Sequence, residues 1–222
     1  LEKPVGRNLA DAEYLLALAS EKEHRAFVAL NRRSFAATRH ALDTLATDDS
    51  PRFILVHDTQ DTNVARSVGQ PEEVIADWMF ANSIHLVDYV RIFGRGEIKD
   101  VTVGLPFNDA QPDNVSATVR FSSGECAVYF GAWNKPGPWY VTAANAQARI
   151  ELRPLEQLGV QLLGERTLAI AEADPDDMSF KPGLLQQARE FLKAHARGPS
   201  TLATLADATQ SMRLVARIYG RD

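Results

Sequence analysis

The sequence predicts an α+β protein in which helices pack on an open, mostly antiparallel β-sheet. Apolar residues recur at helical spacing in the first and last parts of the chain, whereas residues 98–152 form short β-rich runs separated by turn residues. With 222 residues, 45% of them hydrophobic, the chain can bury a sizeable core without disulfides or metal ions.

The first part of the chain predicts alternating helices and strands. Asn8 can cap a helix whose first turn carries Asp11. The expected elements are helices over residues 9–23 and 35–45 and strands over residues 25–30 and 52–57. This order favours an α/β opening. Residues 71–93 contain no internal Pro or Gly and carry a broad apolar stripe, which predicts one long and largely buried helix.

The middle of the chain predicts an antiparallel meander. The expected strands cover residues 98–103, 114–121, 125–133, 139–143 and 148–152. Neither face of the strand 125–133 is plainly polar, so helices would pack on one face, and either a partner subunit or solvent would meet the other. Two helices, over residues 183–195 and 201–219, end the chain.

Composition excludes several classes of function. The net charge of −5 arises from scattered charges, with no basic patch to bind nucleic acid and no apolar stretch long enough to span a membrane. The lone cysteine, Cys126, cannot form an intrachain disulfide and suits a reducing cytoplasm. No two of the five histidines have zinc-ligand spacing, so no metal site is expected.

Lys3 and His85 are the main candidates for chemistry. Lys3 lies in a Glu-Lys-Pro elbow, where Pro4 fixes the local backbone. His85 and Asp88 are three residues apart on an expected helix, so Asp88 could orient the imidazole or stabilise its protonated form. A buried histidine with a carboxylate partner also fits a purely structural role, and Asp88 could belong to a salt bridge.

Other polar and aromatic residues allow both a functional and a structural interpretation. Asn31, Arg32 and Arg33 follow a predicted strand and could line a pocket, with arginine suited to a substrate carboxylate or phosphate. His57 and Asp58 could begin a ligand-binding loop after another strand. The aromatic residues Trp133, Trp139 and Tyr140 could stack on a sugar ring or pack in the sheet or a dimer.

Several motifs occur in an order that resembles one known family. They are Glu2-Lys3-Pro4, NRRSF at 31–35, SIHLVDYVRIFG at 83–94, RPLEQL at 153–158 and TLADATQSMRLVARIYG at 204–220. Together they resemble the glucose-fructose oxidoreductase, inositol dehydrogenase and rhizopine-catabolism (Gfo/Idh/MocA) family over nearly all of the chain. The resemblance implies a C-terminal domain of the dihydrodipicolinate-reductase or glyceraldehyde-phosphate-dehydrogenase type, with helices on one face of the sheet.

The resemblance also implies a division of the whole protein into domains. Residues 1–8 would be the elbow that follows an N-terminal Rossmann domain, and residues 9–222 would be the substrate-binding and oligomerisation domain. The chain begins with Leu1 and contains no G-x-G-x-x-G that follows a strand, so we expect the dinucleotide domain to precede it. The fragment alone would then be inactive.

The activity implied by the resemblance is NAD- or NADP-dependent oxidation or reduction of a sugar, polyol or sugar-derived hydroxyl. Lys3 and His85 would be catalytic, Glu2, Lys3 and Pro4 would contact the cofactor, and the sheet face would form a homo-oligomer. The candidate substrate-binding residues are Asn82, Asn31, Arg33 and Asp88.

One position departs from the family pattern. Better-known members carry an aspartate four residues before the histidine, where this chain has Ala81, which cannot assist proton transfer. Asn82 or Asp88 could take over its role. The alternative is a noncatalytic module that uses the same sheet for ligand binding or dimerisation.

Overall fold

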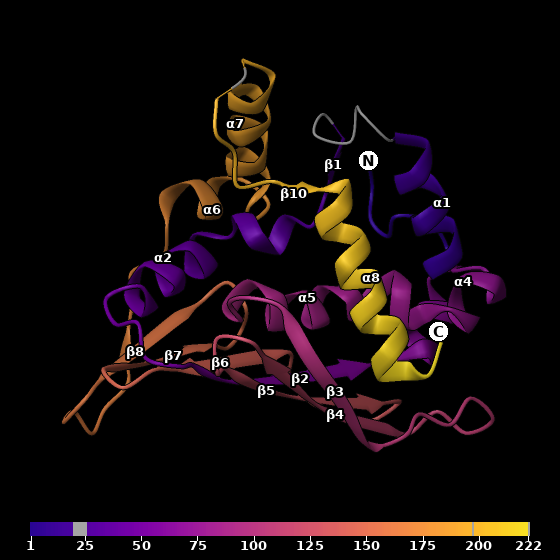
Figure 1. Cartoon of the computed structure of the whole chain (residues 1–222), viewed down its shortest axis with the longest axis horizontal. Helices are drawn as coiled ribbons and strands as arrows, with labels where there is room; N and C mark the ends of the chain where they lie inside the picture. Colours follow the sequence, from indigo (N-terminus) through magenta and orange to yellow (C-terminus); the bar gives the residue numbers. More distant parts are fainter. Residues whose placement is uncertain (20–25, 197, 222) are drawn as a thin grey trace.

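The computed structural model contains one large mixed sheet covered on one face by helices (Figure 1). It describes residues 1–19, 26–196 and 198–221. The sheet has the strand order β3-β4-β5-β2-β6-β7-β8-β9, in which only the β2–β5 pair is parallel. The predicted fold class, an open and mostly antiparallel sheet with helices on one face, is confirmed.

Strict alternation of buried and less buried residues explains the central strands. In β2 (Phe53–Gln60) every second residue is buried, and β4 (Asn114–Phe121) and β6 (Tyr140–Ala144) show the same pattern. The remaining strands of the sheet are β3 (Ile98–Leu105), β5 (Cys126–Trp133), β7 (Ala148–Leu152), β8 (Leu158–Leu162) and β9 (Ala169–Ile170). The last two, β8 and β9, were not predicted from the sequence.

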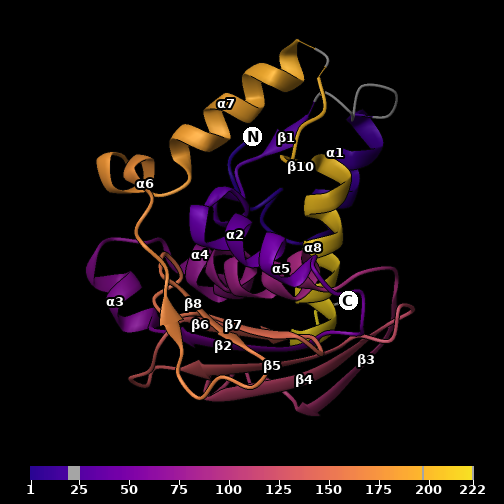
Figure 2. The same cartoon turned by 90° about the vertical axis from the view of Figure 1, so that its left-hand side faces the viewer.

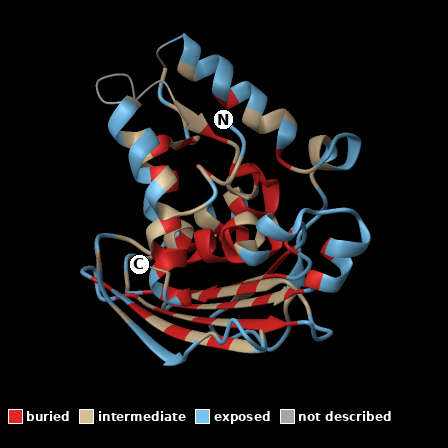
Figure 3. Ribbon diagram, turned by 90° about the vertical axis from the view of Figure 1, so that its right-hand side faces the viewer, coloured by how far each residue is buried: buried red, intermediate tan, exposed pale blue. Residues whose placement is uncertain are grey.

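The helices cover one face of the sheet, some packed directly against it and others stacked on those helices (Figures 2 and 3). The longer ones are α1 (Leu9–Ala19), α2 (Ala36–Leu45), α5 (Ile84–Phe93), α7 (Leu184–His195) and α8 (Leu205–Tyr219). Short helical segments are η2 (Asn31–Ser34), α3 (Thr62–Ser67), α4 (Glu72–Ala76), η3 (Met79–Ser83) and α6 (Pro175–Ser179). No described helix has the length and apolar character needed to cross a membrane.

Local signals fix the helix ends that matter for the site. The Asn8 side chain accepts a hydrogen bond from the Asp11 backbone N–H at 2.9 Å, as its capping role predicts. Thr204 and Asp207 form a capping box, so α8 begins at Leu205 and not at the predicted Thr201. Gly183 precedes α7 with φ of 76°, and a Cβ there would lie 2.6 Å from the Asn31 carbonyl oxygen.

The predicted α/β opening is wrong. The strand β1 (Phe27–Val28) does not join the large sheet but pairs with β10 (Ala203–Thr204), so the beginning and end of the chain meet in a separate two-stranded ribbon. Sequence order alone does not reveal this pairing, because a short apolar run fits either sheet. The described residues do not include His24, the predicted end of the first helix at residue 23 or the predicted strand start at Arg25.

Candidate active site

The Glu-Lys-Pro elbow lies beside β1. The backbone N–H of Ala29 donates to the Leu1 carbonyl oxygen at 2.9 Å, which aligns the start of the chain with the residues that follow β1. From there the Lys3 ammonium donates a hydrogen bond to the Ala81 carbonyl oxygen, 2.5 Å away. The elbow is thereby joined to the helical segment that carries His85, although 78 positions separate Lys3 from Ala81.

The helical segment is broken where the single helix 71–93 was predicted. It consists of α4, the π-helical turn η3 and α5, and η3 contains Ala81 and Asn82. The apolar stripe seen in the sequence continues through all of these turns, so periodicity could not separate them. A π-helical turn is rare and is frequent at functional sites, and this one places the Lys3 contact one turn before His85.

His85 is buried in a positively charged environment. The residue is only 3% exposed, and its Nδ1 atom has no hydrogen-bond partner among the described residues. Its ring centroid lies 6.3 Å from that of Trp139. Burial, reinforced by the charges of Arg32, Lys3 and Lys181, lowers the pKa of His85 to about 2, so the imidazole is neutral at physiological pH.

Lys3 titrates much closer to neutrality than an ordinary lysine. Burial is the largest cause, and the Arg32 charge adds to it, so that the pKa of Lys3 falls to about 8 although Glu2 opposes the shift. At pH 8 the side chain therefore exists as comparable amounts of ammonium and free amine. This is the property required of a group that exchanges protons near neutral pH.

Of the two roles considered for Asp88, the structure shows the salt bridge and no hydrogen bond between Asp88 and His85 among the described residues. The Asp88 carboxylate accepts two hydrogen bonds from Arg33, both 2.8 Å long, and one from Ser211 at 2.6 Å. Burial would raise the pKa of Asp88, but Arg33 outweighs it and holds the pKa below its usual value. The pair is a buried salt bridge between η2 and α5, with α8 contributing the serine.

The predicted substrate-binding candidates also bond within the protein. Asn31 is buried; its amide donates to the Pro182 carbonyl oxygen at 3.4 Å, and its side-chain oxygen accepts from Arg32 at 2.7 Å. Arg33 is committed to Asp88. Asn82 is half-buried beside the Lys3 contact and donates to the Gln60 side chain at 2.8 Å. Of the four candidates, Asn82 is the one on the π-helical turn next to Lys3 and His85.

A buried polar network behind Asn82 was missed by sequence reasoning. Gln60 accepts from both Asn82 and Trp78 and donates to Asp58, and Asp58 also accepts from Tyr129 at 2.6 Å. Burial raises the pKa of Asp58 to about 6, although these hydrogen bonds oppose the shift. His57 and Asp58 therefore lie within β2 and begin no loop, and the buried-face position of Asp58 and Gln60 in the alternating strand was the available signal.

A cavity of about 370 Å³ lies beside Trp139, and His85 is not one of its lining residues. It is lined by Arg32, Pro138, Trp139, Arg153, Pro154, Leu155 and Glu156. The Arg32 guanidinium lies 5.7 Å from the centre of the Trp139 ring. Arg32 and Trp139 had both a functional and a structural interpretation in the sequence. In the structure both line the cavity and both act on His85, Trp139 by lying beside its ring and Arg32 through its charge.

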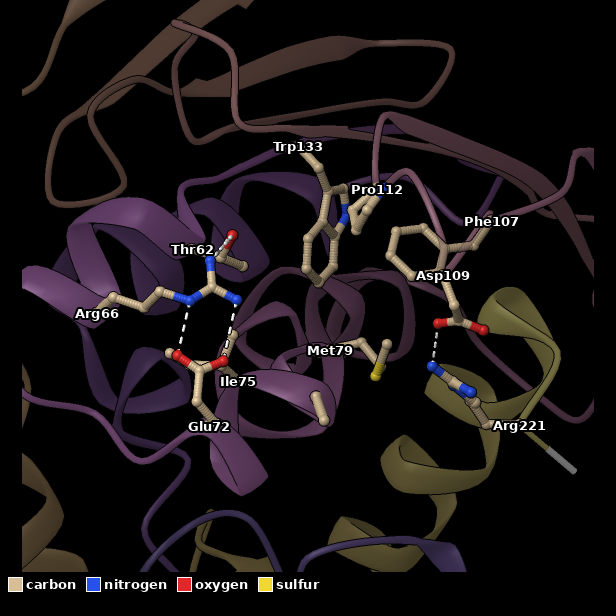
Figure 4. A pocket seen from close by; sticks show the side chains of 11 residues that line it. Thr62, Arg66, Glu72, Ile75, Met79, Phe107, Asp109, Pro112, Trp133 and Arg221 are labelled. Atoms are coloured by element: carbon tan, nitrogen blue, oxygen red, sulfur yellow. Dashed lines mark hydrogen bonds and ion pairs between the residues drawn. The ribbon is translucent and has the colours of Figure 1, made fainter.

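A second cavity, of about 410 Å³, contains none of the predicted catalytic residues, but Trp133, a candidate for stacking on a sugar ring, lines it (Figure 4). Trp133, Phe107 and Met79 form its apolar lining. Its charged groups are paired with one another, Arg66 with Glu72 and Arg221 with Asp109. Among the described residues no group of three potential metal ligands was found.

Comparisons with known proteins support the fold assignment. Searches with the sequence against protein-family models and against curated proteins gave no match. Solved structures do match: levoglucosan dehydrogenase in complex with NADH and levoglucosan aligns with a TM-score of 0.76 and 17% identity, over 99% of this chain and 70% of that one. UDP-N-acetylglucosamine 3-dehydrogenase from Acidithiobacillus ferrooxidans aligns with a TM-score of 0.76 and 15% identity, over 99% and 69% of the two chains.

A dehydrogenase from Chromobacterium violaceum gives a similar result, with a TM-score of 0.74 and 17% identity, over 98% of this chain and 67% of that one. The chain thus spans roughly two-thirds of the length of each of these proteins. It shares the fold of these dehydrogenases over that length, which confirms the fold that the resemblance implies.

Proposed function

We propose that this chain is the substrate domain of an NAD(P)-dependent oxidoreductase that acts on a hydroxyl group of a sugar or polyol. The observation that carries the proposal is the Lys3 ammonium bonded to the π-helical turn before His85, in a half-buried place where its pKa is about 8. The sugar dehydrogenases with the same fold support the substrate class.

The residues present fit a nicotinamide cofactor that is held mainly by a Rossmann domain outside this chain. Glu2, Lys3 and Pro4 form the elbow that would border it, and the buried Nδ1 of His85, which has no hydrogen-bond partner among the described residues, is a polar atom that a bound substrate oxygen would satisfy. A bound nicotinamide supplies the acceptor or donor of the hydride.

Residues of this chain accept and return the proton of the reacting hydroxyl group. When an alcohol is oxidised to a carbonyl, its hydroxyl proton must leave together with the hydride, and the free amine of Lys3 accepts it. In the reverse direction the Lys3 ammonium returns the proton and stabilises negative charge on the oxygen. His85, kept neutral by its surroundings, acts as a hydrogen-bonding partner that orients the oxygen. Asn82, which lies on the π-helical turn next to the Ala81 carbonyl bound by Lys3, contacts the substrate.

The experiment compares NAD(P)H formation by the intact protein with that of Lys3→Ala and His85→Ala, using a panel of sugars and polyols. Loss of the proton carrier should lower kcat by about 100-fold or more in Lys3→Ala, whereas circular dichroism should show an unchanged fold. Turnover by Lys3→Ala at the wild-type rate would contradict the proposal.

A noncatalytic ligand-binding or dimerisation module is the second candidate. It is favoured by Ala81, which offers no side-chain proton carrier, and by Asp88, whose oxygens are taken by Arg33 and Ser211. Sugar binding without hydride transfer to or from any nicotinamide cofactor would identify this function.

The uncovered sheet face supports a homo-oligomer. His57 packs edge to face with Phe130 and Tyr140, with ring centroids 5.4 Å apart in both pairs, and Phe53 on the same strand is 53% exposed. Leu55 and Val128 are half-buried and share this face. A contiguous apolar patch of this kind is typical of a protein interface.

A further inference from the structure

We propose that the substrate carries an anionic group, a carboxylate or a phosphate, and that Arg32 binds this group in the cavity beside Trp139. The inference rests on the proposed function, because it assumes that the reacting hydroxyl lies at Lys3 and His85. It narrows the substrate class from sugars and polyols to their acidic or phosphorylated derivatives.

The cavity has the composition and the position for such a group. Arg32 and Arg153 both line it, and the Trp139 ring that forms one wall lies 6.3 Å, centroid to centroid, from the His85 ring. Trp139 is therefore shared by the cavity and the surroundings of His85, and in the proposed arrangement the anionic group lies in the cavity while the reacting carbon lies at His85. The flat apolar face of an indole suits packing against a sugar ring, and about 370 Å³ is within the usual range for a small-molecule pocket.

Arg32 is held in place with its charge unpaired. Its guanidinium donates one hydrogen bond to Asn31, itself buried and fixed to Pro182, and it lies over the rings of Phe35 and Trp139 at 5.9 and 5.7 Å. The Arg32 Nε atom is buried without a hydrogen-bond partner among the described residues. No carboxylate in the described part of the chain lies within salt-bridge distance of Arg32.

Other cations surround the same place. Lys181 lies in the loop that Asn31 anchors through Pro182, and Lys3 and Arg32 both lower the pKa of His85. Two carboxylates oppose them: Glu156 lines the cavity, and Glu2 raises the pKa of Lys3. Both acidic residues are exposed, as are Lys181 and Arg153, so solvent screens these charges more than it screens those of the half-buried Arg32 and Lys3.

An anionic group would satisfy this excess of positive charge. Arginine presents a planar fork of N–H donors that matches a carboxylate or phosphate, and hydrogen bonds to ionised partners are stronger than neutral ones. A neutral hydroxyl in the same position would leave the charge of Arg32 uncompensated. The site should therefore discriminate between otherwise identical neutral and anionic sugars.

The test is a calorimetric titration of the intact protein with glucose, glucuronate and glucose 6-phosphate, and with galactose and galacturonate. We expect at least one anionic sugar to bind about tenfold or more tightly than its neutral counterpart, and Arg32→Gln to abolish the difference. Arg120→Gln removes one charge from an exposed position on β4 and should leave the preference unchanged.

Equal affinities within each pair, an undiminished preference in Arg32→Gln, or no binding by any of the sugars would overturn the inference. Turnover assays with the same sugars separate it from the proposed function. Oxidation of neutral sugars without any preference for anionic ones would contradict the proposed anion site and support the proposed dehydrogenase activity. Anion-selective binding that depends on Arg32, without hydride transfer, would support the proposed anion site and contradict the proposed dehydrogenase activity.

Discussion

Lys3 and His85 show how the surroundings of a residue decide its chemical role. Both are buried beside Arg32, and this lowers the pKa of Lys3 to about 8 and that of His85 to about 2. The sequence favoured histidine as the acid or base, because an unperturbed imidazole titrates near neutrality. In the folded protein the lysine has the more suitable pKa, and the histidine is a neutral hydrogen-bonding group.

At the residue scale, the rate of alcohol oxidation should rise with pH and level off above pH 8. In the proposed reaction the free amine of Lys3 is the base, and the fraction of free amine increases as the pH passes through the pKa of about 8. Carbonyl reduction needs the ammonium and should fall over the same range. Initial rates from pH 6 to 10 measure both profiles. In Lys3→Arg the transition near pH 8 should disappear, and in His85→Asn it should remain; persistence in Lys3→Arg would assign it to another group.

At the scale of elements, the Arg33–Asp88 salt bridge joins η2 to α5, and Ser211 and Arg91 extend the contact to α8. Arg91 donates to the Ser211 hydroxyl at 2.9 Å and to the Asp207 carbonyl at 2.6 Å. A single polar cluster thus fixes the relative positions of the helices beneath the elbow. The cluster also holds the helical segments that carry Arg32 and His85, the residues of the proposed site.

The corresponding prediction concerns stability. Asp88→Ala should lower the free energy of unfolding by about 3–5 kcal/mol, because it leaves the Arg33 charge buried and unpaired. Replacing both partners with apolar residues, as in Arg33→Met with Asp88→Leu, should lower the free energy of unfolding by less than Asp88→Ala does, because no charge is then left unpaired. Urea unfolding of the three proteins measures the difference. A double variant less stable than Asp88→Ala would show that the pair contributes net stability.

At the scale of the whole molecule, the described helices lie on one side of the sheet and leave its other face without a cover (Figure 3). Phe130 lies near the middle of that face, against His57. If two copies meet there, Phe130→Lys should convert the oligomer to a monomer, since a lysine on each side introduces like charges into the apolar contact. Light scattering measures the mass.

A matched control is Leu192→Lys on α7, where the native leucine is 66% exposed and lies on another element. This variant should keep the wild-type mass. A monomeric wild-type protein, or an unchanged mass in Phe130→Lys, would exclude the sheet face as the interface.

Much of the fold was predictable because its signals are local. Alternation in β2, β4 and β5 and the capping residue of α1 depend on neighbours within a few positions. The strands β8 and β9 were missed, being short and lacking a strong pattern. The parallel pairing of β2 with β5 depends on chain segments about seventy positions apart, which no local window contains.

The sequence by itself determined the fold class, the order of family motifs and the prominence of Lys3 and His85, since these depend on residue type and spacing. Tertiary structure decided what those residues do. In the folded chain Asp88 forms a salt bridge with Arg33, 55 positions away, and the π-helical turn interrupts the predicted helix 71–93. The charges of Lys3, Arg32 and Lys181 act on His85. Burial and the charges of distant residues set pKa values, and both exist only once the chain has folded.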